Sequence, residues 1–158
     1  MSGNIMVKSL AFALLASLSG AADTVDFTGH WQLDAANSQS AFERTQSIEI
    51  VQSGNDVTFT RVFQDHDGKQ VTAKFICSVN GKDCEFTDNG HKAKISLWYN
   101  GPELVVLKTD GDKHDTTVEW HLKLTDGGKT LNVNREIMEP SEQTEKLVFT
   151  KAESVASR

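Results

Sequence analysis

The stretch VEWHLKLTDGGKTLNVNR, residues 118–135, decides the fold class of this chain. On both sides of Asp126–Lys129, apolar and polar residues alternate with the two-residue period of a strand that has one buried face. Glycine and aspartate tolerate the positive φ that a tight chain reversal needs. The stretch therefore predicts a β-hairpin, and a turn at Gly127-Gly128 would place Trp120 opposite Arg135.

The same alternation, interrupted by signals such as Asn80-Gly81 and Asn100-Gly101, recurs along the chain. It predicts ten short strands: Phe27–Asp34, Thr45–Gln52, Val57–Asp65, Lys69–Ser78, Lys82–Thr87, Lys92–Tyr99, Glu103–Thr109, Asp115–Leu124, Lys129–Met138 and Glu145–Lys151. Consecutive strands joined by short turns form a meander, and closing a meander removes its edges. We therefore expect an all-β fold, an antiparallel up-and-down β-barrel of about 8–10 strands.

Residues 1–22 are predicted to be a signal peptide. Lys8 supplies a basic start, residues 9–18 form an apolar run, and Ser19-Gly20-Ala21-Ala22 supply small residues for cleavage. The alternatives are an N-terminal anchor or a buried helix, but the run is short for a bilayer span. We expect one barrel domain over residues 23–152, a flexible tail over 153–158, and a periplasmic or extracellular protein that does not insert into a membrane after cleavage.

The net charge excludes one class of partner. It is −6 for the whole chain, and cleavage would remove Lys8 and make it more negative by one unit. Affinity for nucleic acids comes largely from lysine and arginine side chains that neutralise phosphates. We therefore expect no nucleic-acid partner, and acidic membrane surfaces are disfavoured for the same reason.

Cys77 and Cys84 are the only two cysteines. An even number of cysteines in an exported chain predicts a disulfide. If Asn80-Gly81 is a two-residue hairpin turn, the two cysteines face each other at a distance that a disulfide tolerates, and Phe75 faces Phe86. A metal site or a redox dithiol would need further ligands or a Cys-x-x-Cys spacing, and the sequence has neither.

The order of the connections predicts two different barrel ends. Alternate connections of a meander share an end, so short glycine turns gather at one end and longer acidic connections at the other. We expect the longer-looped end to be the mouth. Its negative potential would repel anions, which favours a neutral or cationic ligand or a weakly held divalent ion.

Histidine and aspartate in these longer connections are candidate ligands for a divalent cation: His66, Asp67, Asp112 and His114. Their spacing matches no established metal motif. Solvated turns have the same composition, because aspartate, asparagine and glycine are the residues that turns need. We expect no cofactor.

Two arginines fall on the apolar phase of their strands, Arg61 and Arg135. A buried cation must find a partner. The partner would be a ligand carboxylate or an aromatic ring, and for Arg135 the candidate rings are those of Trp31 and Trp120. The candidate ligand-binding residues are therefore Trp31, Arg61, Trp120 and Arg135. For Trp31 and Arg135 the alternative is that they close the base of the barrel and do not contact a ligand.

The run Phe27-Thr28-Gly29-His30-Trp31-Gln32-Leu33 resembles the Gly-x-Trp signature of the calycin superfamily, which includes the lipocalins, the fatty-acid-binding proteins and the avidins. Arg135 sits where the lipocalin pattern places an arginine across from that tryptophan. The chain also resembles exported bacterial lipocalin-like proteins of unassigned function, which share this start and a late Asp-Gly-x-Lys-x-Leu run, here residues 126–131. The resemblance implies a small β-barrel with a ligand cavity.

Two functions follow from these patterns. The first is non-catalytic binding of a small, partly apolar or neutral molecule, since the sequence contains no nucleophile motif and no zinc-protease motif. The second is a protein-interaction or homodimerising barrel with a filled interior. Trp98, Val105 and Leu107 would form its apolar outer face, unless the strands are shifted by one residue. A cavity below about 300 Å³ would favour the second function.

Overall fold

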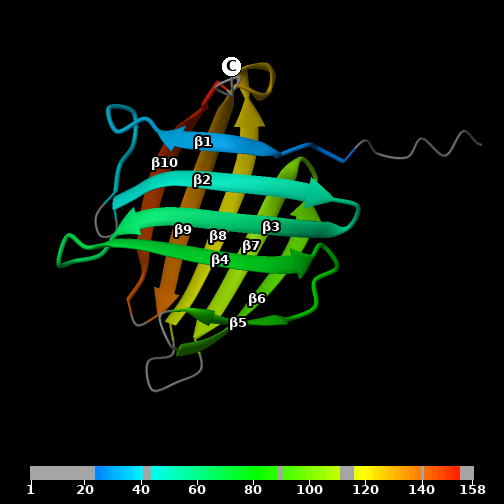
Figure 1. Ribbon diagram of the computed structural model, residues 1–158, viewed down its shortest axis with the longest axis vertical. Coiled ribbons are helices and arrows are strands. Elements are labelled where there is room, and N and C mark those ends of the chain that lie inside the picture. Colours follow the sequence, from blue (N-terminus) through cyan, green and yellow to red (C-terminus); the bar gives the residue numbers. More distant parts are fainter. Residues whose placement is uncertain (1–23, 41–43, 89–90, 111–115, 140, 154–158) are drawn as a thin grey trace, which may run out of the picture.

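The computed structural model (Figure 1) describes residues 24–40, 44–88, 91–110, 116–139 and 141–153. The predicted signal peptide lies outside these residues. In the described part, no helix is long and apolar enough to cross a membrane. The elements are β1 (Gly29–Leu33), β2 (Arg44–Ser53), β3 (Asp56–Gln64), β4 (Gln70–Ser78), β5 (Cys84–Asp88), β6 (His91–Asn100), β7 (Glu103–Asp110), β8 (Thr116–Thr125), the 3₁₀ turn η1 (Asp126–Gly128), β9 (Thr130–Glu139) and β10 (Gln143–Lys151).

The ten strands form one antiparallel sheet, which confirms the all-β barrel expected from the alternation. Their order is β4-β3-β2-β1-β10-β9-β8-β7-β6-β5, so the first and last strands are neighbours in its middle. In Figure 1 the strands β1–β4 cross β6–β10 steeply, as two layers of one coiled sheet. β4 and β5 are the outermost strands of the sheet, and no backbone ladder joins them. We call the junction between β4 and β5 the seam.

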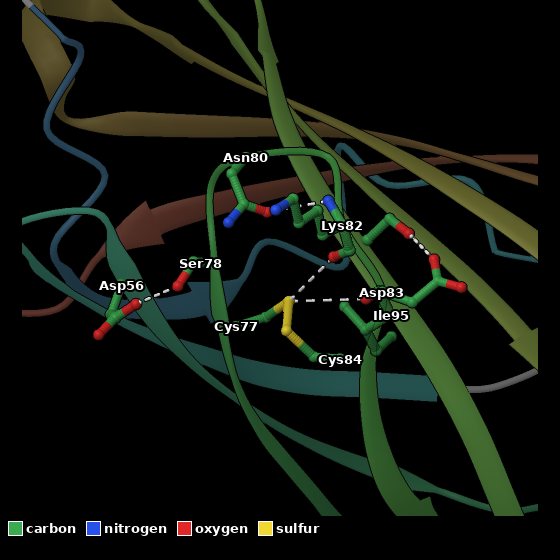
Figure 2. Close-up of a disulfide and its surroundings, with 9 residues drawn as sticks. Asp56, Cys77, Ser78, Asn80, Lys82, Asp83, Cys84 and Ile95 are labelled. Carbon is green, nitrogen blue, oxygen red and sulfur yellow. Dashed lines mark hydrogen bonds between the residues drawn. A yellow bond between two sulfur atoms is a disulfide. The ribbon is translucent and has the colours of Figure 1, made fainter.

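A disulfide joins the two strands at one end of the seam (Figure 2). The Cα atoms of Cys77 and Cys84 are 5.7 Å apart, which confirms the predicted bond. The predicted hairpin between the cysteines is wrong, because β5 pairs with β6 and not with β4. Phe75 and Phe86 nevertheless meet across the seam, with ring centroids 5.9 Å apart.

Residues 79–83 do not form the expected two-residue turn because their polar groups bond to other strands. The Val79 N–H donates to the Asn55 carbonyl at 2.8 Å, and the Gly81 N–H donates to the Leu97 carbonyl at 2.8 Å. The Ser96 hydroxyl donates to Asp83 at 2.6 Å. The link from β4 to β5 is therefore tied to the β2–β3 turn on one side and to β6 on the other.

The hairpin that the opening stretch predicts is present with the predicted register. Trp120 lies opposite Arg135, and the pairing runs to Thr125 and Thr130. The reversal needs glycine, since Gly127 has a φ of 65° and Gly128 a φ of 84°.

The two strands around Trp98 are apolar on both faces. Leu97 and Leu104 belong to the interior cluster, whereas Trp98 is paired with Val105 on the outer face. Val105 is buried outside that cluster, with Trp98 and His121 as its cross-strand neighbours. The alternative of a one-residue shift is therefore wrong.

Replacing Cys77 and Cys84 together by serine is expected to lower the free energy of unfolding by about 2 kcal/mol or less, because the loop that the disulfide closes is short. Urea unfolding of the double variant and of the oxidised wild type measures the difference. A loss of more than about 4 kcal/mol would show that the disulfide stabilises the fold by more than the entropy of closing its own loop.

Candidate functional site

The interior of the barrel has two zones. Toward the short turns it is a solid apolar core, in which Trp31 and Phe27 are fully buried and the Trp31 indole N–H donates to the Phe27 carbonyl at 3.0 Å. Toward the longer connections the inward positions of the strands become charged. Arg61 on β3 and Arg135 on β9 are only 8% and 6% exposed. The predicted placement of both arginines on inner faces agrees with this burial.

Arg135 is held by a buried acid. Its Nη1 donates to Glu145 Oε2 at 2.7 Å, and Glu145 also accepts the Ser40 hydroxyl at 2.9 Å. The Arg135 guanidinium lies 5.4 Å from the ring centroid of Trp120. Trp120 is one of the two candidate rings for Arg135, and the amine of Lys151 lies 5.3 Å from the ring centroid of the other, Trp31. A buried pair of this kind fixes geometry, since losing either partner would leave a charge buried.

Arg61 lies over two aromatic rings. Its guanidinium carbon is 3.9 Å from the centroid of Phe63 and 5.0 Å from that of Trp120. Trp120 is therefore within cation–π range of both Arg61 and Arg135. The structure brings three of the four predicted site residues together and leaves Trp31 in the apolar core.

A small cavity lies beside Arg61, along the inner side of the seam. Its volume is about 40 Å³. We call it the seam pocket, and its lining residues are Phe59, Arg61, Ala73, Phe75, Phe86, Ile95, Val106, Lys108 and Trp120. Phe59 stacks on Phe75 at 5.1 Å and meets Trp120 edge-on at 5.9 Å. These walls offer aromatic faces to an apolar group and two cationic donors to an acceptor.

The seam pocket is far smaller than the roughly 300–1,000 Å³ of ordinary small-molecule sites. Larger hollows of about 490 Å³ and 410 Å³ are lined by Glu103, His121 and Lys146, and by Asp26, Gln52 and Tyr99. The first follows outward-facing positions of β8–β10, and the second lies beside the N-terminal segment at the short-turn end. Binding of a whole molecule inside the barrel would therefore need a side chain of the seam pocket to move.

The candidate metal ligands are only partly described. His66 and Asp67 are exposed in the turn between β3 and β4, with His66 Nε2 and Asp67 Oδ2 3.4 Å apart. Asp112 and His114 lie outside the described residues. Among the residues that the structure describes, no group of three histidine, cysteine, aspartate or glutamate side chains is placed to hold a metal ion. The cation site stays a prediction.

Two charged residues of the inner zone were not predicted: Lys108 and Glu145. Lys108 Nζ is 3.0 Å from Asp110 Oδ2 and 5.9 Å from the ring centroid of Phe86. Alternation could have found Glu145, since it shares the inward phase of Leu147 and Phe149 on β10. Its burial follows from the need of Arg135 for an anionic partner.

Tyr99 marks the opposite, short-turn end of the barrel. Its hydroxyl accepts a hydrogen bond from Gln52 Nε2 at 2.6 Å, while Gln52 Oε1 accepts from the Phe27 N–H. Burial raises the pKa of the Tyr99 phenol above its ordinary value; the Gln52 bond opposes this shift, and the charge of Asp26 adds to it.

Comparison with known proteins identifies the fold as that of a calycin-like small β-barrel. Neither protein-family models nor curated protein sequences give a match. Among solved structures, lipid binding protein 8 of Caenorhabditis elegans is similar with a TM-score of 0.58, at 9% identity, over 80% of this chain and 95% of that chain.

Two further structures resemble this chain. Secretory abundant heat soluble protein 4 of Ramazzottius varieornatus has a TM-score of 0.59 at 11% identity, over 80% of this chain and 95% of its own. A Schistosoma mansoni fatty acid binding protein in complex with arachidonic acid has a TM-score of 0.53 at 12% identity, over 85% of this chain and 100% of its own. At these identities the likeness shows the fold alone.

Replacing Glu145 by glutamine is expected to destabilise the fold by about 3–5 kcal/mol, because the Arg135 charge would stay buried without its acid. Replacing both residues, as Arg135→Met with Glu145→Gln, should cost clearly less than Glu145→Gln or Arg135→Met alone. Urea unfolding of the four proteins forms the double-mutant cycle. Additive losses would contradict a coupled pair.

Tyr99 is the only tyrosine of the chain, so tyrosinate absorbance reports it alone. Its midpoint is expected above 10 in the folded protein and near 10 after unfolding in urea. Since the folded-state pKa is raised, the associated stability is complete below pH 10 and is lost as the pH rises through the folded-state pKa. Equal midpoints in both states would contradict the burial of the phenol.

Proposed function

We propose that this protein is an exported, non-catalytic β-barrel that binds a small, partly apolar, neutral molecule in the seam pocket. The observation that carries the proposal is the chemistry of the pocket walls, because the volume of about 40 Å³ by itself favours a filled barrel. These walls combine aromatic rings with the cations Arg61 and Lys108, at the one junction of the described sheet that has no backbone ladder. In this proposal Arg61 and Trp120 contact the ligand, Arg135 positions Trp120, and Trp31 belongs to the base.

Several observations support the individual parts of the proposal. The Cys77–Cys84 disulfide is typical of oxidising compartments, which supports export. The lining residue Lys108 is paired with Asp110, and Arg135, which lies beside Trp120, is paired with Glu145. This arrangement favours a fixed binding surface over proton transfer. Two of the similar structures are a lipid binding protein and a fatty acid binding protein, which supports an apolar ligand.

The charge of the longer-looped end supports a neutral ligand. The strand ends at the longer-looped end are flanked by acidic residues: Asp65, Asp67, Glu139 and Glu142. An anion that approaches this end meets acidic side chains before it reaches the interior cations.

A second candidate function is favoured by the small volume of the interior. A barrel whose inner cavity is only about 40 Å³ could act through its surface alone. The outer face around Trp98 and Val105 would then contact another protein or a second copy of this chain. Light scattering of the wild type and of a Trp98→Ser variant tests for a homodimer that depends on this face.

The ligand-binding proposal is tested with a neutral and an anionic probe, N-phenyl-1-naphthylamine and its sulfonated relative 8-anilinonaphthalene-1-sulfonate. We expect the neutral probe to quench tryptophan fluorescence with little dependence on pH. Binding of the anionic probe should strengthen from pH 8 to pH 5, since histidine protonation weakens the repulsion.

The measurement is a titration at low salt, with circular dichroism as the control for folding. The absence of any response to either probe would overturn the ligand-binding proposal. Tighter binding of the anion at pH 8 than at pH 5 would show that the acidic loops do not border the entrance.

A further inference from the structure

β5 is a weakly anchored strand of the sheet. It has only five residues, Cys84–Asp88, and its backbone ladder runs to β6 alone. Glu85 and Thr87 point outward and are exposed, and the inward ring of Phe86 is only half-buried. Segments with few buried contacts and one-sided hydrogen bonding open at low free energy, so β5 is the strand that separates from its neighbours most readily.

The two ends of the seam differ in how they are held. At one end, the Cys77–Cys84 bond and the tied residues 79–83 fix β4 to β5 (Figure 2). At the other end, β4 begins at Gln70 and β5 ends at Asp88, and neither strand pairs with the other. Separation of the strands would therefore pivot about the disulfide and widen toward Gln70 and Asp88.

Phe86 stands at the seam side of the pocket. Its ring meets Phe75 at 5.9 Å, and Lys108 Nζ lies 5.9 Å from its centroid. We infer that the ligand enters the seam pocket sideways between β4 and β5, with Phe86 as the gate and the disulfide as the fixed pivot. This inference rests on the proposed function, because it assigns an entrance to the proposed site.

The walls of the pocket also indicate the class of ligand. Phe59 and Phe75 are stacked with an interplanar angle of 12°, so Phe75 presents a flat face beside the ring of Phe86. When Phe86 moves aside, a planar aromatic ring of the ligand can pack on Phe75 in its place and replace the lost Phe75–Phe86 contact. The ligand that fits is a neutral aromatic molecule with an acceptor group for Arg61 or Lys108.

Entry from the longer-looped end would disturb more of the interior. Arg61 lies over Phe63 on that side, and the partly buried pair Lys108–Asp110 and the buried pair Arg135–Glu145 occupy the same zone. Displacing either pair would leave a charge without its partner. Moving Phe86 breaks only its contact with Phe75 and its long cation–π contact with Lys108. Entry through the seam therefore costs less free energy than entry from the longer-looped end.

The test is stopped-flow association of N-phenyl-1-naphthylamine with the full chain. Phe86→Ala is expected to raise the association rate about tenfold, and Phe86→Leu to raise it less, because each removes part of the gate. Ile76→Ser is the matched control, since Ile76 is 62% exposed on the outer face of β4 and should leave the rate unchanged. Phe75→Leu, on the facing strand, replaces Phe86→Ala if that variant does not fold.

Hydrogen exchange supplies a measurement without ligand. Amides of β5 should exchange at least about tenfold faster than those of β8 and β9, and bound probe should slow them. Equal exchange in β5 and β9, or a wild-type association rate in both Phe86 variants, would overturn the side entrance while the binding function stands. If no form binds the probe, the proposed function fails, and the side entrance fails with it.

Discussion

The unpaired junction between β4 and β5 is the constraint on which the rest of the structure depends. Every other strand of the described sheet has a backbone ladder on both sides, whereas these two strands have one each. Exposed strand edges are a liability, and this chain turns its two edges toward one another. The Cys77–Cys84 disulfide and the contact between Phe75 and Phe86 join the two strands in place of backbone hydrogen bonds. Both phenylalanines line the seam pocket.

The division of the interior into an apolar half and a charged half follows from the same geometry. The apolar half needs nothing beyond tight packing, and Trp31, Phe27 and Phe149 are fully buried there. In the other half, Arg135 and Glu145 must be paired, because an unpaired charge could not remain in such a place. Trp120 lies at the boundary between the halves, beside both arginines.

Local patterns predicted most of the fold because strand alternation and turn chemistry are local properties. The register of Trp120 with Arg135 is an example, since four turn residues determine it. The partner of β5 was predicted wrongly for a related reason. Asn80-Gly81 resembles a hairpin signal, but the Val79 N–H donates to Asn55 and the Gly81 N–H donates to Leu97, and no local pattern shows these distant partners.

The candidate site was only partly predictable. The apolar phase of β3 and β9 correctly placed Arg61 and Arg135 inside, but it could not say which rings they would meet. Lys151 took the place over Trp31 because β1 pairs with β10, a contact between the two ends of the sequence. The volume of the interior depends on how side chains from many strands fill the space, so periodicity carries no information about it.

The pairing of β1 with β10 has a consequence for how the chain reaches its folded state. The ladder at the middle of the sheet joins Trp31 to Lys151 and Leu33 to Phe149, so the sheet is incomplete until the last strand is available. Contacts between such distant segments form slowly, because the chain must first close a long loop. The complete sheet therefore forms only after β10 has been synthesised, whereas local hairpins such as β8–β9 do not have to wait for it.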